Sequence, residues 1–311
     1  MSSMPAQEFA YRFRSADTCN MCGASAQQTA VIGKRLNSAQ GLRPTKRIGI
    51  TTTVVRCQSC GLIFCDPMPI PLDIEQHYGK PPDAYWQAHY FATDDQYFQP
   101  QIDRFRTLWT GNGTPAALDI GAGVGKAMAS LAANDFDTYG LEPSEPFLNH
   151  AVERTGIDAS RLQHATIEDA DLPAGRFDFV SFGAVLEHLC DPAAAIEKAL
   201  GWTAPNGLIQ IEVPSARWLT SRLANRAYRL QGLDYASNLS PMHIPYHLYE
   251  FTLDSFRQHA ARATYELAGH HRLIGRTFLP RSLDAIGTKV MKATRTGMQL
   301  EVWLRNASSR H

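Results

Sequence analysis

The sequence contains no long apolar run and no excess of charge of either sign. No stretch approaches the ~18 consecutive apolar residues of a membrane-spanning helix, so we do not expect an integral membrane protein. The first residues, MSSMPAQEFAYRFRS, lack the apolar centre of a secretory signal, and we therefore expect a cytoplasmic location. Thirty basic residues balance thirty acidic ones. A net charge of zero creates no overall field that would attract nucleic acid.

The chain is long enough for one large domain and a smaller unit. It has 311 residues, of which 44% are hydrophobic and 19% charged. These proportions are typical of globular proteins that bury a substantial core. At roughly 100–200 residues per domain, the length predicts one main domain with an accessory module.

Cysteine is scarce, but four of the six cysteines stand in two pairs. Cys19 and Cys22 form one pair, Cys57 and Cys60 the other, and a glycine follows each pair. In a reducing compartment this spacing indicates a metal site rather than a disulfide framework. Four thiolates predict a closed, tetrahedral, structural zinc ion. A redox-active pair is the alternative, and it would need only one CxxC.

Changes in composition divide the chain into three parts. Residues 1–66 comprise a tail and the predicted zinc-binding module, which ends at a cluster of prolines. Residues 67–113 are rich in aromatic side chains and predict a helical connector or lid. Residues 114–311 alternate between β-prone and helical segments, which predicts a parallel sheet covered by helices on both faces. An insert at 215–250 interrupts this alternation.

The alternation predicts specific elements in the third part. We expect strands at 116–120, 138–141, 177–182, 208–213, 265–273 and 298–304. We expect helices at 126–134, 146–154, 192–202, 253–263 and 283–292.

A glycine-rich turn follows the first of these strands. The segment LDIGAGVG places Gly121, Gly123 and Gly125 between a strand and a helix, where the backbone approaches a ligand closely. A dinucleotide fingerprint would have its third glycine at position 126, where this chain has Lys126. Glu142 ends the second strand about twenty residues on, where an acid accepts hydrogen bonds from both ribose hydroxyls. The combination predicts a nucleoside cofactor that is not a dinucleotide.

With these motifs the sequence resembles the class I S-adenosylmethionine-dependent methyltransferases. The resemblance covers about residues 114–275 and rests on LDIGAGVGKAMASL, YGLEPSE, LPAGRFD and VLEHLCDP. One branch of this family carries an N-terminal zinc-ribbon-like module ending in CxxCGLIF and a proline, as at Cys57–Pro67. That branch often shows an HxYxFT element, here HLYEFT at His247–Thr252. The resemblance implies a Rossmann-like, mostly parallel α/β fold, S-adenosylmethionine as the cofactor, and action in glycan, nucleotide-sugar or natural-product pathways.

The resemblance also implies where the cofactor lies. The three glycines would border its methionine moiety with an aspartate below them, and Glu142 would hold the ribose. Two residues after the third strand of the family's fold would flank the adenine, and two at the end of its fourth strand, here 177–182, would lie beside the sulfonium. The implied cofactor residues are Asp119, Gly121, Gly123, Gly125, Glu142, Thr166, Ile167, Phe182 and Gly183. All lie at the carboxyl edge of the expected sheet, although each is alternatively a turn or core position.

Methyl transfer to oxygen calls for a general base, because a hydroxyl is a poor nucleophile until its proton leaves. Histidine is the natural candidate. His247 lies in the insert and is placed first as the base, with His188 as an orienting or alternative base. Each is alternatively a hydrogen-bonded structural histidine. Some ubiquinone-pathway O-methyltransferases bind a divalent metal here through Glu-x-x-Glu-His, but Ala184 replaces the first glutamate, so we expect no catalytic metal.

The insert contains four arginines between Ser215 and Leu233 without one acidic residue. Their spacing predicts a helix with several guanidinium groups on one face, which suits a diphosphate. A solvated basic face is the alternative. The candidate substrate residues of the insert are Arg222, Arg226, His243 and Tyr249.

Two classes of function are compatible with these features. The first is a methyltransferase that methylates a hydroxyl on a sugar, a nucleotide sugar or a related glycan precursor. The second is an enzyme that modifies a nucleic acid or protein recognised by the zinc module. Residues 57–110 hold many carboxylates and few basic groups, so the positive patch that nucleic acid requires is missing. We therefore expect a small-molecule acceptor, and the glycine turn with Glu142 argues against a non-catalytic binding protein.

Overall fold

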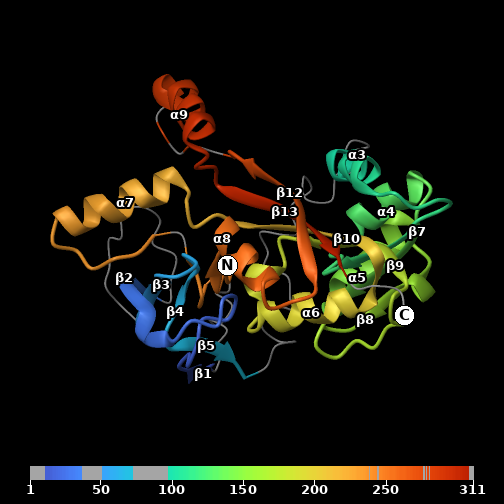
Figure 1. Cartoon of the computed structure of the whole chain (residues 1–311), viewed down its shortest axis with the longest axis horizontal. Helices are drawn as coiled ribbons and strands as arrows, with labels where there is room; N and C mark the ends of the chain where they lie inside the picture. Colours follow the sequence, from blue (N-terminus) through green and yellow to red (C-terminus); the bar gives the residue numbers. More distant parts are fainter. Residues whose placement is uncertain are drawn as a thin grey trace, which may run out of the picture.

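The computed structural model describes residues 11–36, 51–72 and 97–307, apart from positions 238, 244, 276, 278 and 280. Within these ranges a group of small β-sheets lies beside a larger α/β unit (Figure 1). None of the described helices combines the length and apolar character needed to cross a membrane. Most of the predicted aromatic connector, at 73–96, lies outside the described residues. The boundaries at 66 and 113 therefore stay predictions.

The large unit is built on a seven-stranded sheet in the order β12-β13-β10-β9-β6-β7-β8. Its strands are β6 (Ala116–Ile120), β7 (Asp137–Glu142), β8 (Leu162–His164), β9 (Phe177–Gly183), β10 (Thr203–Pro214), β12 (Tyr265–Leu273) and β13 (Gln299–Asn306). The five strands from β6 to β10 run parallel, and β13 is antiparallel to both β10 and β12. The predicted mostly parallel α/β fold is confirmed.

Helices cover both faces of this sheet (Figure 1). On one face α3 buries Ile102 and Phe105 against Phe179 and Trp303, whose stacked rings have centroids 5.7 Å apart. On the other face α6 and α8 pack against alternate residues of the same strands. The helices are α3 (Gln99–Leu108), α4 (Lys126–Ala133), α5 (Glu145–Thr155), α6 (Pro192–Trp202), α7 (Leu219–Leu230), α8 (Leu253–Ala260) and α9 (Arg281–Thr294), with 3-10 turns η1 (Ala26–Gln28), η2 (Ala159–Arg161) and η3 (Leu186–His188).

The predicted elements agree with the structure to within a few residues, except at the start of β10. The sequence predicts a turn at 205–207 and a strand from 208. The strand instead begins at Thr203, which pairs with Phe177, and the register shifts before Leu208. Asn206 has a positive φ of 63°, and the Asn306 amide donates to the Thr203 carbonyl at 2.7 Å. Residues 205–207 therefore form an irregularity within β10 and not a separate turn before it.

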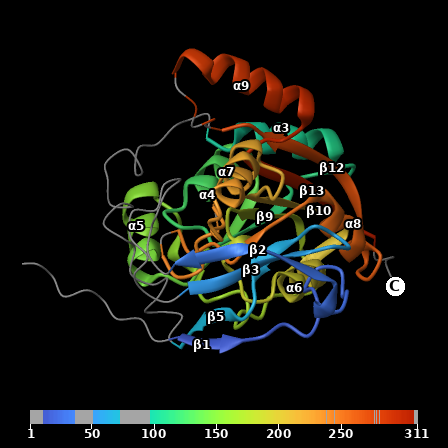
Figure 2. The same ribbon diagram turned by 90° about the vertical axis from the view of Figure 1, so that its left-hand side faces the viewer.

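The N-terminal unit contains two small sheets. Strands β1 (Tyr11–Arg14) and β5 (Met68–Pro71) pair with each other, and the second sheet has the order β11-β4-β3-β2. Its strands are β2 (Thr29–Leu36), β3 (Thr51–Cys57), β4 (Ile63–Cys65) and β11 (Tyr249–Glu250). Because β11 belongs to the end of the insert, the insert completes a sheet of the N-terminal unit. Helix α7 lies above β2 and β3 in both views (Figures 1 and 2).

Candidate functional site

The predicted glycine turn lies at the carboxyl edge of the sheet, between β6 and α4. Gly121, Gly123 and Gly125 all have positive φ, which side-chain-bearing residues rarely adopt. A Cβ at Gly121 would lie 2.6 Å from Cγ2 of Val185, in the segment that follows β9. The turn is therefore tightly packed against the chain leaving β9 and presents its backbone at the edge where α/β folds bind ligands.

Glu142 ends the neighbouring strand β7 and is joined to this turn. Its side chain is 4% exposed, and its Oε2 accepts a hydrogen bond from the Gly123 N–H at 2.7 Å. Its Oε1 accepts from the Ser144 N–H, also at 2.7 Å. Burial raises the pKa of Glu142 to about 7, while both backbone hydrogen bonds oppose the rise. Because each carboxylate oxygen has a second lone pair, the group retains the capacity to accept from two ribose hydroxyls.

Asp119 lies on β6, two residues before the glycine turn. Its Oδ1 accepts a hydrogen bond from the Ser181 hydroxyl at 2.6 Å, across the paired strands β6 and β9. Burial raises the pKa of Asp119 to about 6, and the bond from Ser181 opposes this rise. The sequence analysis did not single out Ser181, because only the strand register brings these two residues together.

The other implied cofactor residues occupy different environments. The Thr166 hydroxyl donates to Asp169 Oδ2 at 2.8 Å, so it supports the turn after β8. Ile167 is 4% exposed and packs in the core. Phe182 is also fully buried, whereas Gly183 is exposed at the end of β9. The contacts to adenine and sulfonium at these positions stay predictions.

The two candidate histidines meet beside the end of β9. The Leu248 N–H donates to the Glu187 carbonyl at 2.8 Å, and a ring nitrogen of His188 lies 3.3 Å from the Tyr246 carbonyl. These contacts lay the end of the insert along η3. The ring centroids of His188 and His247 are consequently 5.0 Å apart, at an angle of 65°.

Glu187 completes this cluster. One of its carboxylate oxygens lies 3.7 Å from Nε2 of His247, and the other is buried without a hydrogen-bond partner among the described residues. Burial raises the pKa of Glu187 to about 8 and lowers that of His247 to about 3, with the charges of His188 and His243 contributing to the latter. Burial also lowers the pKa of His188 to about 4. Both imidazoles are therefore neutral at pH 7.

The sequence analysis missed Glu187, although it stands next to His188 in the VLEHLCDP motif. Its role depends on the approach of His247, which lies sixty residues away in the chain. One ligand atom from each of Glu187, His188 and His247 lies within 4.8 Å of the others, a spacing that also suits a shared cation.

The candidate substrate residues of the insert do not form one group. His243 Nε2 lies 3.4 Å from a guanidinium nitrogen of the buried Arg35. The Tyr249 hydroxyl is buried and donates to the Cys190 carbonyl at 3.1 Å. Arg222 and Arg226 are exposed on α7. Burial lowers the pKa of Arg56, and the positive charge of Arg222 lowers it further.

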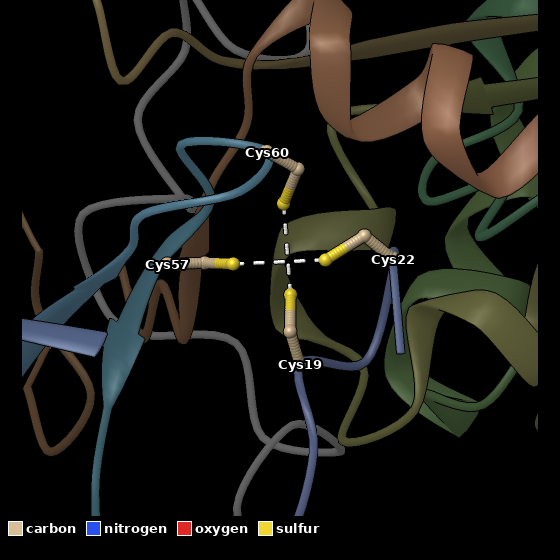
Figure 3. Close-up of side chains that lie close together, drawn as sticks. All are labelled: Cys19, Cys22, Cys57 and Cys60. Atoms are coloured by element: carbon tan, nitrogen blue, oxygen red, sulfur yellow. Dashed lines mark hydrogen bonds between the residues drawn. The ribbon is translucent and has the colours of Figure 1, made fainter. Parts of the chain in front are cut away.

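The four paired cysteines converge on one point between the two knuckles (Figure 3). The Sγ atoms of Cys19 and Cys60 are 3.6 Å apart, as are those of Cys22 and Cys57, and none forms a disulfide. Tetrahedral zinc with Zn–S bonds of about 2.3 Å requires sulfur atoms ~3.8 Å apart. The four thiols therefore fit a zinc ion in both number and spacing.

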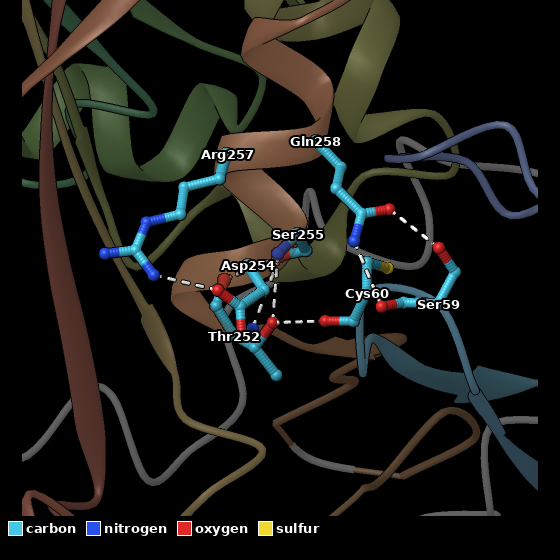
Figure 4. Close-up of polar contacts among 7 residues, drawn as sticks. All are labelled: Ser59, Cys60, Thr252, Asp254, Ser255, Arg257 and Gln258. Atoms are coloured by element: carbon cyan, nitrogen blue, oxygen red, sulfur yellow. Dashed lines mark hydrogen bonds and ion pairs between the residues drawn. The ribbon is translucent and has the colours of Figure 1, made fainter.

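The second knuckle is bound to the start of α8 (Figure 4). The Thr252 hydroxyl donates to the Cys60 carbonyl at 2.5 Å and also caps the helix by accepting from the Ser255 N–H at 3.0 Å. The Gln258 amide donates to the Ser59 carbonyl at 3.0 Å. The cysteine cluster is thus connected directly to a helix that covers the large sheet.

Comparison with known proteins matches residues 90–270, more than half of the chain, to the family described as methyltransferase domain. An uncharacterized methyltransferase of Mycobacterium tuberculosis (strain H37Rv) is 31% identical over 125 residues, which cover 37% of this chain and 64% of that protein. A ubiquinone biosynthesis O-methyltransferase of Psychrobacter cryohalolentis is 32% identical over 111 residues, covering 34% of this chain and 43% of that protein. The matched segments thus span less than two thirds of these relatives.

Among solved structures, an S-adenosylmethionine-dependent methyltransferase of Mesorhizobium loti has a TM-score of 0.45 and 14% identity, covering 68% of this chain and 98% of that one. The sheet order, the glycine turn and the buried acid at the carboxyl edge define a Rossmann-like α/β domain. The family match is more specific, and the chain belongs to the methyltransferase domain family. This confirms the family that the motifs predicted and supports S-adenosylmethionine as the cofactor.

Proposed function

We propose that this protein transfers a methyl group from S-adenosylmethionine to a hydroxyl of a small acceptor, namely a sugar, a nucleotide sugar or a related glycan precursor. The observation that carries the proposal is the neutral His247 held beside buried Glu187, next to the strand end that borders the glycine turn. The O-methyltransferases among the relatives support oxygen as the methylated atom. Balanced net charge and acid-rich residues 57–110 favour a small acceptor over a nucleic acid.

The cofactor supplies a methyl group activated by the positive sulfur. In this chain Glu142 accepts hydrogen bonds from the ribose, and the backbone of the glycine turn borders the methionine moiety. Asp119 and Ser181 hold that turn from below. Fixing the acceptor oxygen in line with the methyl group contributes up to ~7–11 kcal/mol of the barrier reduction in well-oriented reactions. The insert, which carries His247, provides the acceptor side of the site.

His247 is the general base in this proposal. Its neutral imidazole would take the proton of the acceptor hydroxyl, while the bound cofactor would supply the methyl group and its sulfur would keep the electrons of the carbon–sulfur bond. Glu187, in its ionised form, stabilises the imidazolium that results. His188 is a positioning residue, fixed by the Tyr246 carbonyl and in ring contact with His247.

We further propose that Cys19, Cys22, Cys57 and Cys60 bind a structural zinc ion. Their number, sulfur spacing and convergence support this assignment. Because all four positions are thiolates, the site has no open position for catalysis. Its effect is to fold the two knuckles and to anchor the start of α8 through Cys60.

Replacing Glu142 with alanine is expected to weaken binding of S-adenosylmethionine. Loss of two ribose hydrogen bonds, each worth about 0.5–1.5 kcal/mol, corresponds to roughly 5-fold to 150-fold in affinity. Isothermal titration calorimetry measures the effect. Glu145→Ala, which removes an exposed carboxylate three residues away, is the matched control and should bind normally. Unchanged affinity in Glu142→Ala would show that the ribose lies elsewhere.

The acceptor class is tested by incubating the protein with methyl-labelled S-adenosylmethionine and a panel of nucleotide sugars, with RNA as the counter-test. We expect label in one or more sugar acceptors and none in RNA. Label in RNA alone would contradict the proposed acceptor and favour recognition of a macromolecule by the zinc module.

A further inference from the structure

A basic cavity of about 550 Å³ lies where the end of β12 meets α9 and the loop after it. Its described lining includes His270, His271, Arg272, Lys292 and Arg295, and none of the described lining residues is acidic. A cavity of this size accommodates a small ligand or part of one. Neither the cofactor residues nor the histidine cluster contributes to it.

Arg272 carries an uncompensated charge in this cavity. It is partly buried, and its Nε is buried without a hydrogen-bond partner in the part of the chain that the structure describes. Burial lowers the pKa of Arg272, and the charges of Arg217, Arg295 and Arg257 lower it further. Asp254 acts in the opposite direction, but it already pairs with Arg257 at 2.9 Å.

The four arginines come from separate segments of the chain. Arg217 follows β10, Arg257 lies on α8, Arg272 is the last but one residue of β12, and Arg295 follows α9. Gathering like charges around a partly buried guanidinium is unfavourable unless an anion neutralises them. Arg272 and Arg295 line the cavity, and two guanidinium groups match a diphosphate because each presents a planar fork of N–H donors to phosphate oxygens.

The sheet register places this cavity within reach of the proposed active site. Gly183 pairs with Glu212 on β10, Glu212 with Glu301 on β13, and Glu301 with His271 on β12. These residues form one row across four neighbouring strands. Since neighbouring strands are about 4.8 Å apart, His271 lies ~14 Å along the row from Gly183. The cavity is at the same carboxyl edge, because Leu273 and Pro214 share the partner Gln299.

We propose that this cavity binds the diphosphate, or an equivalent phosphate group, of the acceptor, with Arg272 and Arg295 as its principal ligands. This inference rests on the proposed function for the identity of the acceptor, but the anion site itself is independent of methyl transfer. It assigns the acceptor to the phosphate-bearing class, such as a nucleoside diphosphate sugar. The diphosphate then binds at the edge of the sheet and not at the exposed arginines of α7, where the sequence pattern predicts it.

The test is direct binding of inorganic pyrophosphate and of uridine diphosphate to the full-length protein, measured by calorimetry. Both probes are expected to bind one site, and Arg272→Gln and Arg295→Gln should each weaken binding about tenfold or more, as expected for charge-assisted hydrogen bonds. Arg272→Lys, which keeps the charge but loses the fork, should give an intermediate loss. Lys289→Gln on exposed α9 and Arg226→Gln on α7 are charge-matched controls that should bind normally.

Each outcome decides the inference. Absence of saturable binding by either probe, or equal binding by the wild type and by both cavity variants, would overturn it. Loss of binding in Arg226→Gln alone would place the anion on α7 and would also overturn it. S-Adenosylmethionine binding is measured in the same samples. Cofactor binding without pyrophosphate binding refutes the anion site only, whereas pyrophosphate binding without cofactor binding refutes the proposed function only.

Discussion

Turnover should fall about 100-fold or more when His247 is replaced by alanine, while affinity for S-adenosylmethionine stays nearly unchanged. His247 is the imidazole that the insert brings against Glu187; its low pKa keeps it neutral, and ionised Glu187 would stabilise the imidazolium that forms when it takes the hydroxyl proton. His188→Ala is expected to have a smaller effect, because His188 is fixed to the Tyr246 carbonyl and acts through the neighbouring ring. Separate measurements of turnover and cofactor binding distinguish loss of the base from loss of the fold.

The pH dependence of turnover provides a second readout of the same cluster. With a pKa of about 8, Glu187 is mainly protonated below that pH and ionised above it. Because the ionised form stabilises an imidazolium on His247, turnover of the wild type should rise with pH through about 8. The Glu187→Gln variant has no ionisable group at this position, so its turnover should lose this rise while it still binds the cofactor.

Near-normal turnover in both His247→Ala and His188→Ala would remove histidine base catalysis from the proposal.

Loss of the proposed zinc site should have the largest effect on the integrity of the fold. Structural zinc in zinc-finger peptides contributes ~10–16 kcal/mol of apparent binding free energy, and that energy is coupled to folding. Cys19→Ser removes one of four thiolate ligands from a buried cluster. We therefore expect the variant to lose zinc and to unfold at a clearly lower temperature than the wild type. Native mass spectrometry should show one zinc ion per chain in the wild type only.

Cys190→Ser is the matched control for this prediction. Cys190 is a free cysteine that lies outside the four-thiol cluster, so its serine variant should retain one zinc ion. The effect of Cys19→Ser should extend beyond the knuckles, because the Cys60 carbonyl anchors Thr252 at the start of α8. Wild-type protein without zinc, or full zinc content in Cys19→Ser, would refute the assignment.

The parts of the site that the sequence predicts are those set by local pattern. The strand, turn and helix around Gly121–Gly125 follow from residue types at fixed spacing, and so does the position of Glu142 at the end of the next strand. The convergence of Cys19 and Cys22 with the second knuckle follows from ligand chemistry. In each case the prediction rests on short motifs whose residues lie close together in the sequence.

The remaining parts depend on contacts between distant segments. The contact between Glu187 and His247 forms where the end of the insert, including β11, folds back and β11 pairs with β4. Ser181 meets Asp119 only through the register of β9 with β6. The cavity around Arg272 and the loop after α9 requires the antiparallel return of β13, which residue periodicity does not reveal.

Binding of S-adenosylmethionine at the turn between β6 and α4 is tested most directly by calorimetric titration of the wild-type protein with that cofactor. The expected result is one site per chain, with competition by the demethylated product S-adenosylhomocysteine and weaker binding in Glu142→Ala. No saturable binding by folded, zinc-containing protein, or binding that Glu142→Ala leaves unchanged, would contradict a methyltransferase cofactor site at this turn.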